Sequence, residues 1–423
     1  MPKAVGSSLS IGRSPSSPEV EDMLHVAAAI PSLRGKYAHL LGLSRPVDLA
    51  DVPVLTQDEY HETVRQLLED PRHRQGAILS AGGGTLTHPE LSMLPDDMFA
   101  PQLLARWKPL GSGDVVANLF PAGRLQSAFH FFNVYAALCG ATTVPIGHLN
   151  DDELGQWLDF LENRGVTALA APSAVIARVV RMAAASGRSL PWLHKILLSS
   201  SGDVTGTAEL VRLHLPQARI WGLYCSPASG PIGHNTPECP ADTFHVLPHQ
   251  YVEVEDERLI VTNMHADSAF PLLRFQTGGL VDLVTCTCGR AEPTVRLRGQ
   301  SGSALTFRSR TFAAEELVAL ACGEEDVAEA QVMLVNQGTA DEQLCLAVRL
   351  RPGVPADEYT SGWIRSQVLG RHLTLRGAVD EAPESFEVIA VERLSGAAMV
   401  GGAPALVIAE QIPEVFHQYE EAS

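Results

Sequence analysis

Short apolar runs alternate with helical patterns between Gln75 and Tyr224. The runs predict buried strands at Val115 to Phe120, Thr142 to Ile146, Ala168 to Ala171, Lys195 to Ser199 and Arg219 to Tyr224. Helical spacing between them predicts helices at Leu125 to Cys139, Asp152 to Asn163, Ser173 to Ala185 and Thr207 to Leu215. Such alternation favours right-handed crossovers and a mostly parallel sheet covered on both faces. Because ligands of such sheets bind at the carboxyl ends of strands, we expect a site in the loops that follow them.

The pattern changes on either side of this region. Residues 1–18 are rich in Ser, Pro and Gly, which predicts a flexible arm, and helical spacing follows to about residue 72. Tyr251 to Val254 and Leu259 to Asn263 predict shorter strands, typical of a smaller sheet or barrel that closes a large domain. We therefore expect a large domain over residues 19–300.

A compact α+β unit is predicted from residue 301 to residue 410, followed by a tail at 411–423. Helical spacing occurs near Glu315 to Ala321 and Glu358 to Leu369, and strand patterns occur near Ala328 to Asn336, Gln343 to Arg349 and Glu387 to Val391. The chain as a whole is predicted to be α/β, with a large, mostly parallel domain and a small C-terminal domain.

Composition restricts the partners. The net charge of -18 disfavours nucleic acid, whose phosphates are bound by clustered Lys and Arg. No apolar run reaches the roughly 18 residues that cross a bilayer, and no secretion signal is recognisable, so we expect a cytoplasmic protein without a membrane partner. Only four lysines occur, and none follows Lys195, which excludes any mechanism that needs a lysine from the C-terminal half.

The most recognisable stretch runs from Pro271 to Gln300 and contains P-L-L-R-F-Q-T-G-G-L followed by C-T-C-G-R. It resembles the segment that ends the large domain of phenylacetate-CoA ligases, within the adenylate-forming acyl-CoA ligase superfamily. The resemblance covers roughly Asp48 to Val400. It implies a large adenylate-forming-ligase-type domain and a mobile small domain.

Several positions that the resemblance assigns to chemistry carry other residues. Gly279 replaces the ribose-binding Asp, Gln300 the hinge Arg, Ala228 the magnesium-holding Glu and His88 the loop lysine, and only Arg393 lies near the position of the C-terminal lysine. The family's ATP or AMP and magnesium are therefore not expected to serve ordinary adenylation, and we assign no catalytic residue.

The glycine-rich stretch I-L-S-A-G-G-G-T is the best candidate for a phosphate-binding loop. Gly82, Gly83, Gly84 and Thr85 would let backbone N–H groups approach a phosphate, because glycine has no Cβ. A tight glycine turn without a ligand is the alternative. Tyr224 belongs to the same candidate site, because the resemblance implies that it frames the adenine.

Two successive strand ends supply a candidate substrate pocket, which comprises Gly202, Asp203, Tyr224, Cys225 and Ser226. The alternative is a loop that binds nothing. Cys225 is also a candidate nucleophile by position alone.

Four residues are suited to a metal site: Cys239, His245, Cys286 and Cys288. Three thiolates and one imidazole suit tetrahedral zinc, although their spacing is not that of a standard finger. Buried, reduced thiols with a packed histidine are the alternative. The resemblance favours structural zinc, since some phenylacetate-CoA ligase relatives carry a similar metal.

Two functions follow. The first is a degenerate phenylacetate-CoA ligase-like protein that binds an aromatic or acyl carboxylate, or a carrier-linked acyl group, as an accessory or repurposed protein of specialised metabolism. The second is an active, atypical aryl-carboxylate adenylating enzyme or acyl-CoA ligase. Under either, CoA or the phosphopantetheine of a carrier protein is an expected partner, and a homodimer is a further expectation.

Overall fold

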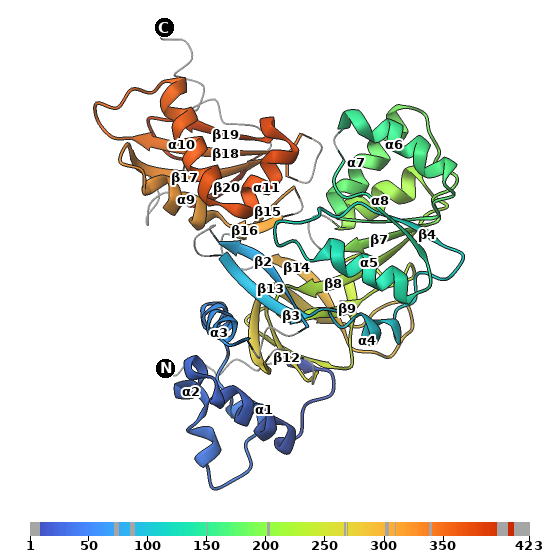
Figure 1. Cartoon of the computed structure of the whole chain (residues 1–423), viewed down its shortest axis with the longest axis vertical. Coiled ribbons are helices and arrows are strands. Elements are labelled where there is room, and N and C mark those ends of the chain that lie inside the picture. The colour runs from blue at the N-terminus through green and yellow to red at the C-terminus, as the bar shows by residue number, and fades with distance from the viewer. Residues whose placement is uncertain are drawn as a thin grey trace.

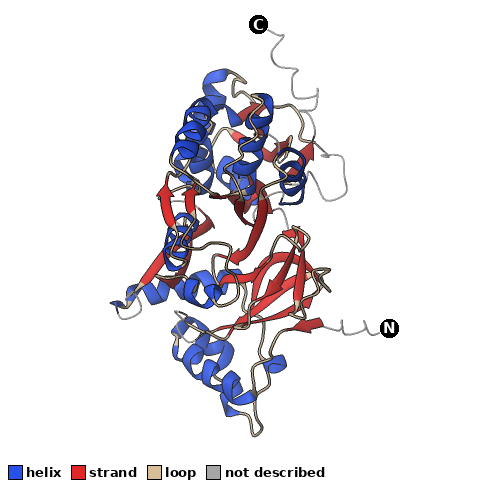
Figure 2. Cartoon of the chain, turned by 90° about the vertical axis from the view of Figure 1, so that its right-hand side faces the viewer, coloured by secondary structure: helices blue, strands red, loops and turns tan. Residues whose placement is uncertain are grey.

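The computed structural model describes residues 9–71, 76–84, 89–149, 151–200, 204–265, 268, 270–300, 304–308, 310–337, 341–395 and 405–409. The N-terminal helices α1 and α2 lie at one end of the molecule, and α10 and β19 lie near the other (Figure 1); Figure 2 shows the same chain from the side. None of the described helices has the length and apolar character that crossing a membrane requires.

One twelve-stranded sheet organises the large domain, in the order β1-β11-β12-β13-β14-β10-β9-β8-β7-β6-β4-β5. Its parallel part comprises β4 (Val115–Asn118), β5 (Thr142–Pro145), β6 (Ala168–Ala171), β7 (Lys195–Ser199) and β8 (Arg219–Ser226). These are the strands that the apolar runs predict, so the parallel sheet is confirmed.

Helices cover both faces of the parallel strands. Ala168, Ala170 and Leu197 pack with α5 (Ala128–Leu138) and α4 (Ala100–Leu104) on one face. Leu169 and Leu198 face the other side, together with α6 (Asp151–Asn163), α7 (Ser173–Ala185) and α8 (Val204–His214). Neighbouring residues of a strand point to opposite faces of the sheet. Because helices cover both faces here, residues on both faces must be apolar, and the strands are continuous apolar runs.

The sheet continues with antiparallel strands beyond β8. They are β9 (Gly230–His234), β10 (Thr243–Val246), β11 (Gln250–Glu255), β12 (Arg258–Asn263), β13 (Leu272–Val284) and β14 (Thr294–Gln300). The short strands predicted here are present as β11 and β12. The smaller sheet or barrel expected from them is corrected, because hydrogen bonds between β8 and β9 join both parts into one sheet.

Ordered structure begins earlier than the sequence predicts. Leu9–Ile11 form β1, which pairs antiparallel with β11, and α1 begins at Ser17. The prediction of a flexible arm over residues 1–18 is therefore wrong from Leu9 onward. The prediction relied on the low apolar content of this segment. A short segment can pair with an exposed strand edge through its backbone alone, and such pairing needs few apolar side chains.

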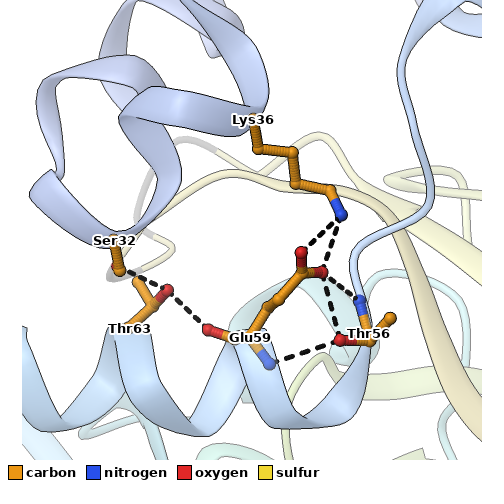
Figure 3. Close-up of polar contacts among 5 residues, drawn as sticks. All are labelled: Ser32, Lys36, Thr56, Glu59 and Thr63. Carbon is orange, nitrogen blue, oxygen red and sulfur yellow. Dashed lines mark hydrogen bonds and ion pairs between the residues drawn. The ribbon is translucent and has the colours of Figure 1, made fainter.

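Three helices, α1 (Ser17–Ala29), α2 (Pro31–Tyr37) and α3 (Gln57–Glu69), form the N-terminal layer, and 3-10 turns occupy Leu40–Gly42 and Leu49–Asp51. Polar contacts hold α3 to α2 (Figure 3). Lys36 Nζ lies 2.7 Å from both carboxylate oxygens of Glu59, and Glu59 also accepts from the backbone N–H of Thr56, the residue that caps α3. The contacts fix the first turn of α3, which carries Gln57.

A hairpin of β2 (Ala77–Gly84) and β3 (Pro89–Pro95) lies between the large domain and the C-terminal part (Figure 1). The sequence predicts a loop at the glycines of this stretch. In the structure Gly82, Gly83 and Gly84 extend β2 instead. Strand β16 and helix α11 of the C-terminal part pack against β2.

The C-terminal part is a four-stranded sheet in the order β19-β18-β17-β20 with helices packed against it. This part begins with a two-stranded ribbon, β15 (Ala304–Phe307) and β16 (Arg310–Ala313). Its helices are α9 (Ala314–Cys322), α10 (Glu358–Arg371) and α11 (Leu373–Glu381), with a 3-10 turn at Pro383–Ser385. The strands of its sheet are β17 (Val327–Val335), β18 (Gln343–Leu350), β19 (Phe386–Ala390) and β20 (Leu406–Ala409). The predicted helices and strands of this part are confirmed, and β15, β16, α11 and β20 are additions. The boundary at residue 300 stays a prediction.

Candidate functional site

A cavity of about 900 Å³ opens where the parallel strands end, between the large domain and the C-terminal part. Its lining includes Ser199 and Tyr224 at the ends of β7 and β8, Thr277 of β13 and Glu316 of α9. The carboxyl ends of parallel strands are where a site is expected, and the structure places the cavity there.

One arm of the cavity is apolar and lies inside the large domain. Phe120 and Phe132 stack with ring centroids 4.6 Å apart, and Phe131 meets Phe132 edge to face. All three rings are buried, and all three line the cavity. This arm can accept a flat or extended apolar group, because the aromatic walls provide contact area without a charged group.

The predicted phosphate-binding stretch reaches the cavity in part. Gly82 lines it. Gly82, Gly83 and Gly84 end β2, where the register with β3 shifts between Ala81 and Gly84. Thr85 and His88 lie outside the described residues. The phosphate-binding role of Gly82, Gly83, Gly84 and Thr85 stays a prediction.

Three of the predicted substrate-pocket residues are brought together on the end of β8. Tyr224, Cys225 and Ser226 all line the cavity. Gly202 and Asp203, which were predicted beside them, lie outside the described residues. The Cys225 side chain opens on the cavity, yet surrounding protein raises the pKa of its thiol to about 12. The raised pKa lowers the fraction of thiolate, which is the reactive form. Cys225 stays a candidate nucleophile by position.

Tyr224 occupies the space beside Gly279. A Cβ added at Gly279 would lie 2.7 Å from the Tyr224 hydroxyl oxygen, which also bonds to the Thr277 side chain. The Tyr224 ring is buried. Its hydroxyl thus fills the volume that a larger side chain at position 279 would need.

The other altered positions lie around the same strands. Gln300 stands directly opposite Gly279 in the β13–β14 pair. Ala228 lines the cavity and packs into the apolar core beneath the N-terminal helices. Arg393 is absent from the described residues that line the cavity. No carboxylate stands at position 228 or 279 to hold magnesium or a ribose.

Acidic groups line part of the cavity. Glu90 of β3 lies near Glu316 of α9, and burial, with the charges of Glu316 and Asp58, raises the pKa of Glu90 to about 7. His61 of α3 lies 4.0 Å from the Glu90 carboxylate. Glu342 also lines the cavity and accepts a hydrogen bond from the backbone N–H of Arg308.

Two arginines line the cavity, and both have carboxylate partners. Arg310 forms a two-pronged ion pair with Glu381. Arg298 lies 3.0 Å from Asp282, which Arg296 contacts as well. Neither guanidinium is left without a counterion. No lysine occurs among the described residues that line the cavity.

Helix α3 contributes to the same wall through its first two turns. Gln57 donates a hydrogen bond to the carbonyl of Thr277, 3.0 Å away, and so connects α3 with β13. His61 follows one turn later and bonds to the carbonyl of Leu91. Burial lowers the pKa of His61, so its ring adds no full charge near neutral pH.

The four predicted metal ligands come together at one end of the antiparallel strands. Ligand atoms of Cys239, His245, Cys286 and Cys288 all lie within 4.8 Å of one another. His245 Nε2 is 3.2 Å from Cys288 Sγ and 3.5 Å from Cys239 Sγ. A tetrahedral ion with bonds of about 2.3 Å needs ligand atoms roughly 3.7 Å apart, so the set fits zinc.

Glu292 lies behind His245. The two buried atoms, His245 Nδ1 and Glu292 Oε2, face each other at 3.5 Å, and neither has another hydrogen-bond partner within the described structure. A carboxylate in this place fixes the ring so that Nε2 points at the thiols. The fully buried imidazole is thereby aimed at the position of a metal.

Neither protein-family models nor curated proteins match this chain. Solved structures do. A 2-hydroxyisobutyryl-CoA ligase in complex with 2-HIB-AMP and CoA, in the thioesterification state, has a TM-score of 0.75 at 15% identity and covers 96% of this chain and 91% of its own. The same ligase in the postadenylation state, with 2-HIB-AMP, has a TM-score of 0.57 at 16% identity, over 95% and 90% of the two chains.

The amide bond synthetase McbA from Marinactinospora thermotolerans has a TM-score of 0.59 at 15% identity, over 91% of this chain and 81% of its own. At such identities these likenesses establish the fold alone, which is that of adenylate-forming ligases. The predicted fold class is confirmed.

Sequence reasoning missed several residues that form the cavity, namely Gln57, His61, Glu90, Glu316 and the phenylalanines of the apolar arm. The run F-H-F-F at residues 129–132 carried a usable signal, because adjacent aromatics on one helix cannot all face a single core. Glu90 and Glu316 carried none, because only the packing of α9 against the hairpin region brings them together.

Proposed function

We propose that this protein is a degenerate phenylacetate-CoA ligase-like protein that binds an aromatic or acyl group in the cavity without ordinary adenylation. The group would be a carboxylate or a carrier-linked acyl chain. Its role would be accessory or repurposed, in specialised metabolism. The apolar arm formed by Phe120, Phe131 and Phe132 would hold the ring or chain.

The observation that carries this proposal is the contact between Tyr224 and Gly279. The resemblance assigns a ribose-binding carboxylate to position 279, and here the Tyr224 hydroxyl takes up that volume. Ala228 offers no oxygen to magnesium, and Mg²⁺ requires hard oxygen ligands. A nucleotide would therefore lose its ribose contact and its metal at once.

An acyl thiol partner, such as CoA or a phosphopantetheine, is supported by the arrangement of the two parts. The thioesterification state of the ligase described above matches this chain with a TM-score of 0.75, whereas its postadenylation state matches with 0.57. An open conformation of the ligase, which also holds 2-HIB-AMP and CoA, matches with 0.56. The arrangement of the two parts is therefore similar to that of the thioesterification state.

ATP–pyrophosphate exchange over a panel of aryl and alkyl carboxylates tests the proposal, together with calorimetric titration of ATP and magnesium. We expect no exchange and no saturable ATP binding. Exchange that disappears when Gly84 is replaced by a bulky residue would contradict the proposal. It would establish the second function, an atypical aryl-carboxylate adenylating enzyme.

ATP binding without exchange would also contradict the proposal as stated, because it would require a nucleotide site where Tyr224 stands. Such a result would indicate a scaffold that is gated by nucleotide.

We also propose that Cys239, His245, Cys286 and Cys288 hold a structural zinc ion. The fit of the ligand atoms and the position of Glu292 support it. Zinc would stabilise the turn between β13 and β14 and would take no part in chemistry, because a site with four protein ligands leaves no open position. Elemental analysis of protein purified without added metal tests this, and a content far below one ion per chain would refute it.

A further inference from the structure

A turn that follows β4 lies between two cavities. The larger is the cavity described above, which Leu125 and Gln126 line. The smaller holds about 370 Å³ where the large domain meets α11, and its lining includes Gly123, Arg124 and Asp380. The turn therefore contributes to the wall of the binding cavity on one side and meets the C-terminal part on the other.

The backbone of this turn is strained. Gly123, Arg124 and Leu125 have φ angles of 75°, 48° and 62°, so three residues in a row adopt the left-handed conformation. Glycine adopts it freely, whereas the Cβ of any other L-residue crowds the following carbonyl oxygen. Strained backbone of this kind persists only where surrounding contacts hold it.

Contacts on both sides hold the turn. The Arg124 guanidinium pairs with the Asp380 carboxylate of α11 at 2.5 Å. The carbonyl of Leu125 accepts a hydrogen bond of 3.1 Å from the backbone N–H of Ala81, where the register between β2 and β3 begins to shift. The Arg124 and Asp380 side chains are 48% and 43% exposed, and an exposed ion pair is weak. Strain and a weak contact therefore oppose each other.

We propose that Gly123, Arg124 and Leu125 form a strained latch, which transmits the position of the C-terminal part to the hairpin β2–β3. While α11 is in place, the ion pair holds the turn, and the turn holds Ala81. When α11 moves away, the turn relaxes and Ala81 loses its acceptor. The end of β2, where Gly82 lines the cavity, then loosens. The latch goes beyond the proposed function, because it does not depend on which ligand the cavity binds.

Hydrogen exchange of the Ala81 amide tests the latch, since this amide is the donor to the turn. Asp380→Asn breaks the ion pair from the C-terminal side, and we expect Ala81 to exchange about two- to fivefold faster. Mass spectrometry with fragmentation to single amides measures the rate. Glu329→Gln is the control, because it breaks a pair within the C-terminal sheet, and it should leave the rate unchanged.

Direct packing is the competing explanation, because α11 and β16 also contact β2. Arg124→Gln removes the charge of the latch and leaves that packing in place. In this background we expect Asp380→Asn to have no further effect on Ala81, since the pair that it breaks is already lost. An undiminished effect of Asp380→Asn would overturn the latch.

Leu125→Gly tests the strain. Glycine accepts a φ of 62° without crowding, so we expect Ala81 to exchange roughly threefold more slowly than in the wild type. Adding Asp380→Asn should return the rate to near the wild-type value. Leu125→Asn is a second variant that keeps a side chain, because asparagine tolerates this conformation. Ala122→Gly is the matched control, since Ala122 is exposed and lies before the left-handed residues, where glycine only adds flexibility.

The sign of the glycine effect decides the outcome. Faster exchange of Ala81 in both Leu125→Gly and Leu125→Asn would show that the turn is unstrained and would overturn the proposal. An unchanged rate in Asp380→Asn would overturn it as well. Neither result bears on ligand binding, and failure of the cavity to bind an acyl or aromatic group would leave the latch standing.

Discussion

Tyr224 and Gly279 define the site at the scale of single residues. The sequence alone shows that an aspartate is replaced at position 279, but it does not show what becomes of the space. The structure places the Tyr224 hydroxyl there, in contact with Thr277. The absence of a side chain at Gly279 and the position of the Tyr224 hydroxyl are therefore coupled.

A pair of substitutions tests this coupling. Gly279→Ala places a methyl group against the Tyr224 hydroxyl, and overpacking of this kind costs about 1–3 kcal/mol in the free energy of unfolding. Tyr224→Phe removes the hydroxyl, so we expect the double variant to be more stable than the sum of the single effects predicts. Urea unfolding of the wild type, the two single variants and the double variant measures these free energies. If the effects of the two single substitutions simply add in the double variant, the contact between Tyr224 and position 279 is contradicted.

Glu90 predicts a dependence of stability on pH. Its pKa in the folded protein is about 7 and its ordinary value is 4.5, so the folded state binds more protons between these values. Stability is therefore lost as pH rises from about 4.5 to 7. Because 46% of the Glu90 side chain remains exposed, we expect solvent to limit the effect to about 1 kcal/mol.

Glu90→Gln removes this titration. We expect its free energy of unfolding, relative to the wild type, to rise by about 1 kcal/mol between pH 5 and pH 8. Denaturant titrations at several pH values measure it, and the exposed Glu162→Gln on α6 is the control for the change of charge. A constant difference across the pH range would show that Glu90 has its ordinary pKa.

At the scale of elements, the strands and helices of the parallel region follow from the sequence. Buried strands and amphipathic helices have long, regular apolar patterns, and β6, β7 and α7 have the predicted bounds. The hairpin β2–β3 was missed, because glycine is a poor strand former and its run suggested a loop. β1 was missed because three residues within a Ser- and Gly-rich segment carry almost no apolar pattern.

The residues of the candidate site likewise fall into those that the sequence predicts and those that it does not. Tyr224, Cys225 and Ser226 were predicted because they follow one strand directly. The grouping of Cys239, His245, Cys286 and Cys288 was predicted from residue type, and the structure confirms the grouping. Glu316 could not be predicted, because its position depends on how the C-terminal part packs against the large domain.

The metal cluster joins three elements and predicts how metal removal acts. Cys239 follows β9, His245 belongs to β10, and Cys286 and Cys288 lie in the turn between β13 and β14. We expect a chelator to lower the melting temperature by several degrees, because the ion connects strands that are far apart in the chain. Calorimetric melting with and without chelator measures it.

Two variants sharpen the test of the metal. Cys288→Ser should lose most of the bound metal, whereas Glu292→Gln should retain it with an affinity about 10–100-fold lower. Competition with a coloured chelator measures the affinity. Equal affinities in Glu292→Gln and the wild type would show that Glu292 does not orient His245.

At the scale of the whole molecule, ion pairs hold the C-terminal part against the large domain. Arg124 lies 2.5 Å from Asp380, and His148 Nδ1 lies 3.2 Å from the carboxylate of Glu381. The cavity extends across this boundary, so these pairs hold its two walls together. The Arg124–Asp380 pair is largely exposed, and such pairs contribute about 0–1 kcal/mol, whereas His148 and Glu381 are largely buried.

Replacing both large-domain partners, as Arg124→Ala with His148→Ala, should shift the molecule toward more open arrangements by roughly fivefold. Arg310 keeps its partner Glu381 in this variant, so the C-terminal part itself stays intact. Small-angle X-ray scattering should show a larger radius of gyration. Arg349→Ala, which breaks a pair within the C-terminal sheet, is the control. Identical scattering from the two variants would contradict the role of these pairs.

The three-residue strand β1 has a consequence for handling the protein. It covers the outer edge of β11, whose backbone groups would otherwise be open to pairing with a second molecule. Short edge strands protect large sheets from edge-to-edge aggregation, and here one backbone segment, Leu9–Ile11, provides that protection for the twelve-stranded sheet. Trimming the N-terminus to Ser17 would therefore remove a safeguard of solubility, although it touches neither the cavity nor the metal ligands.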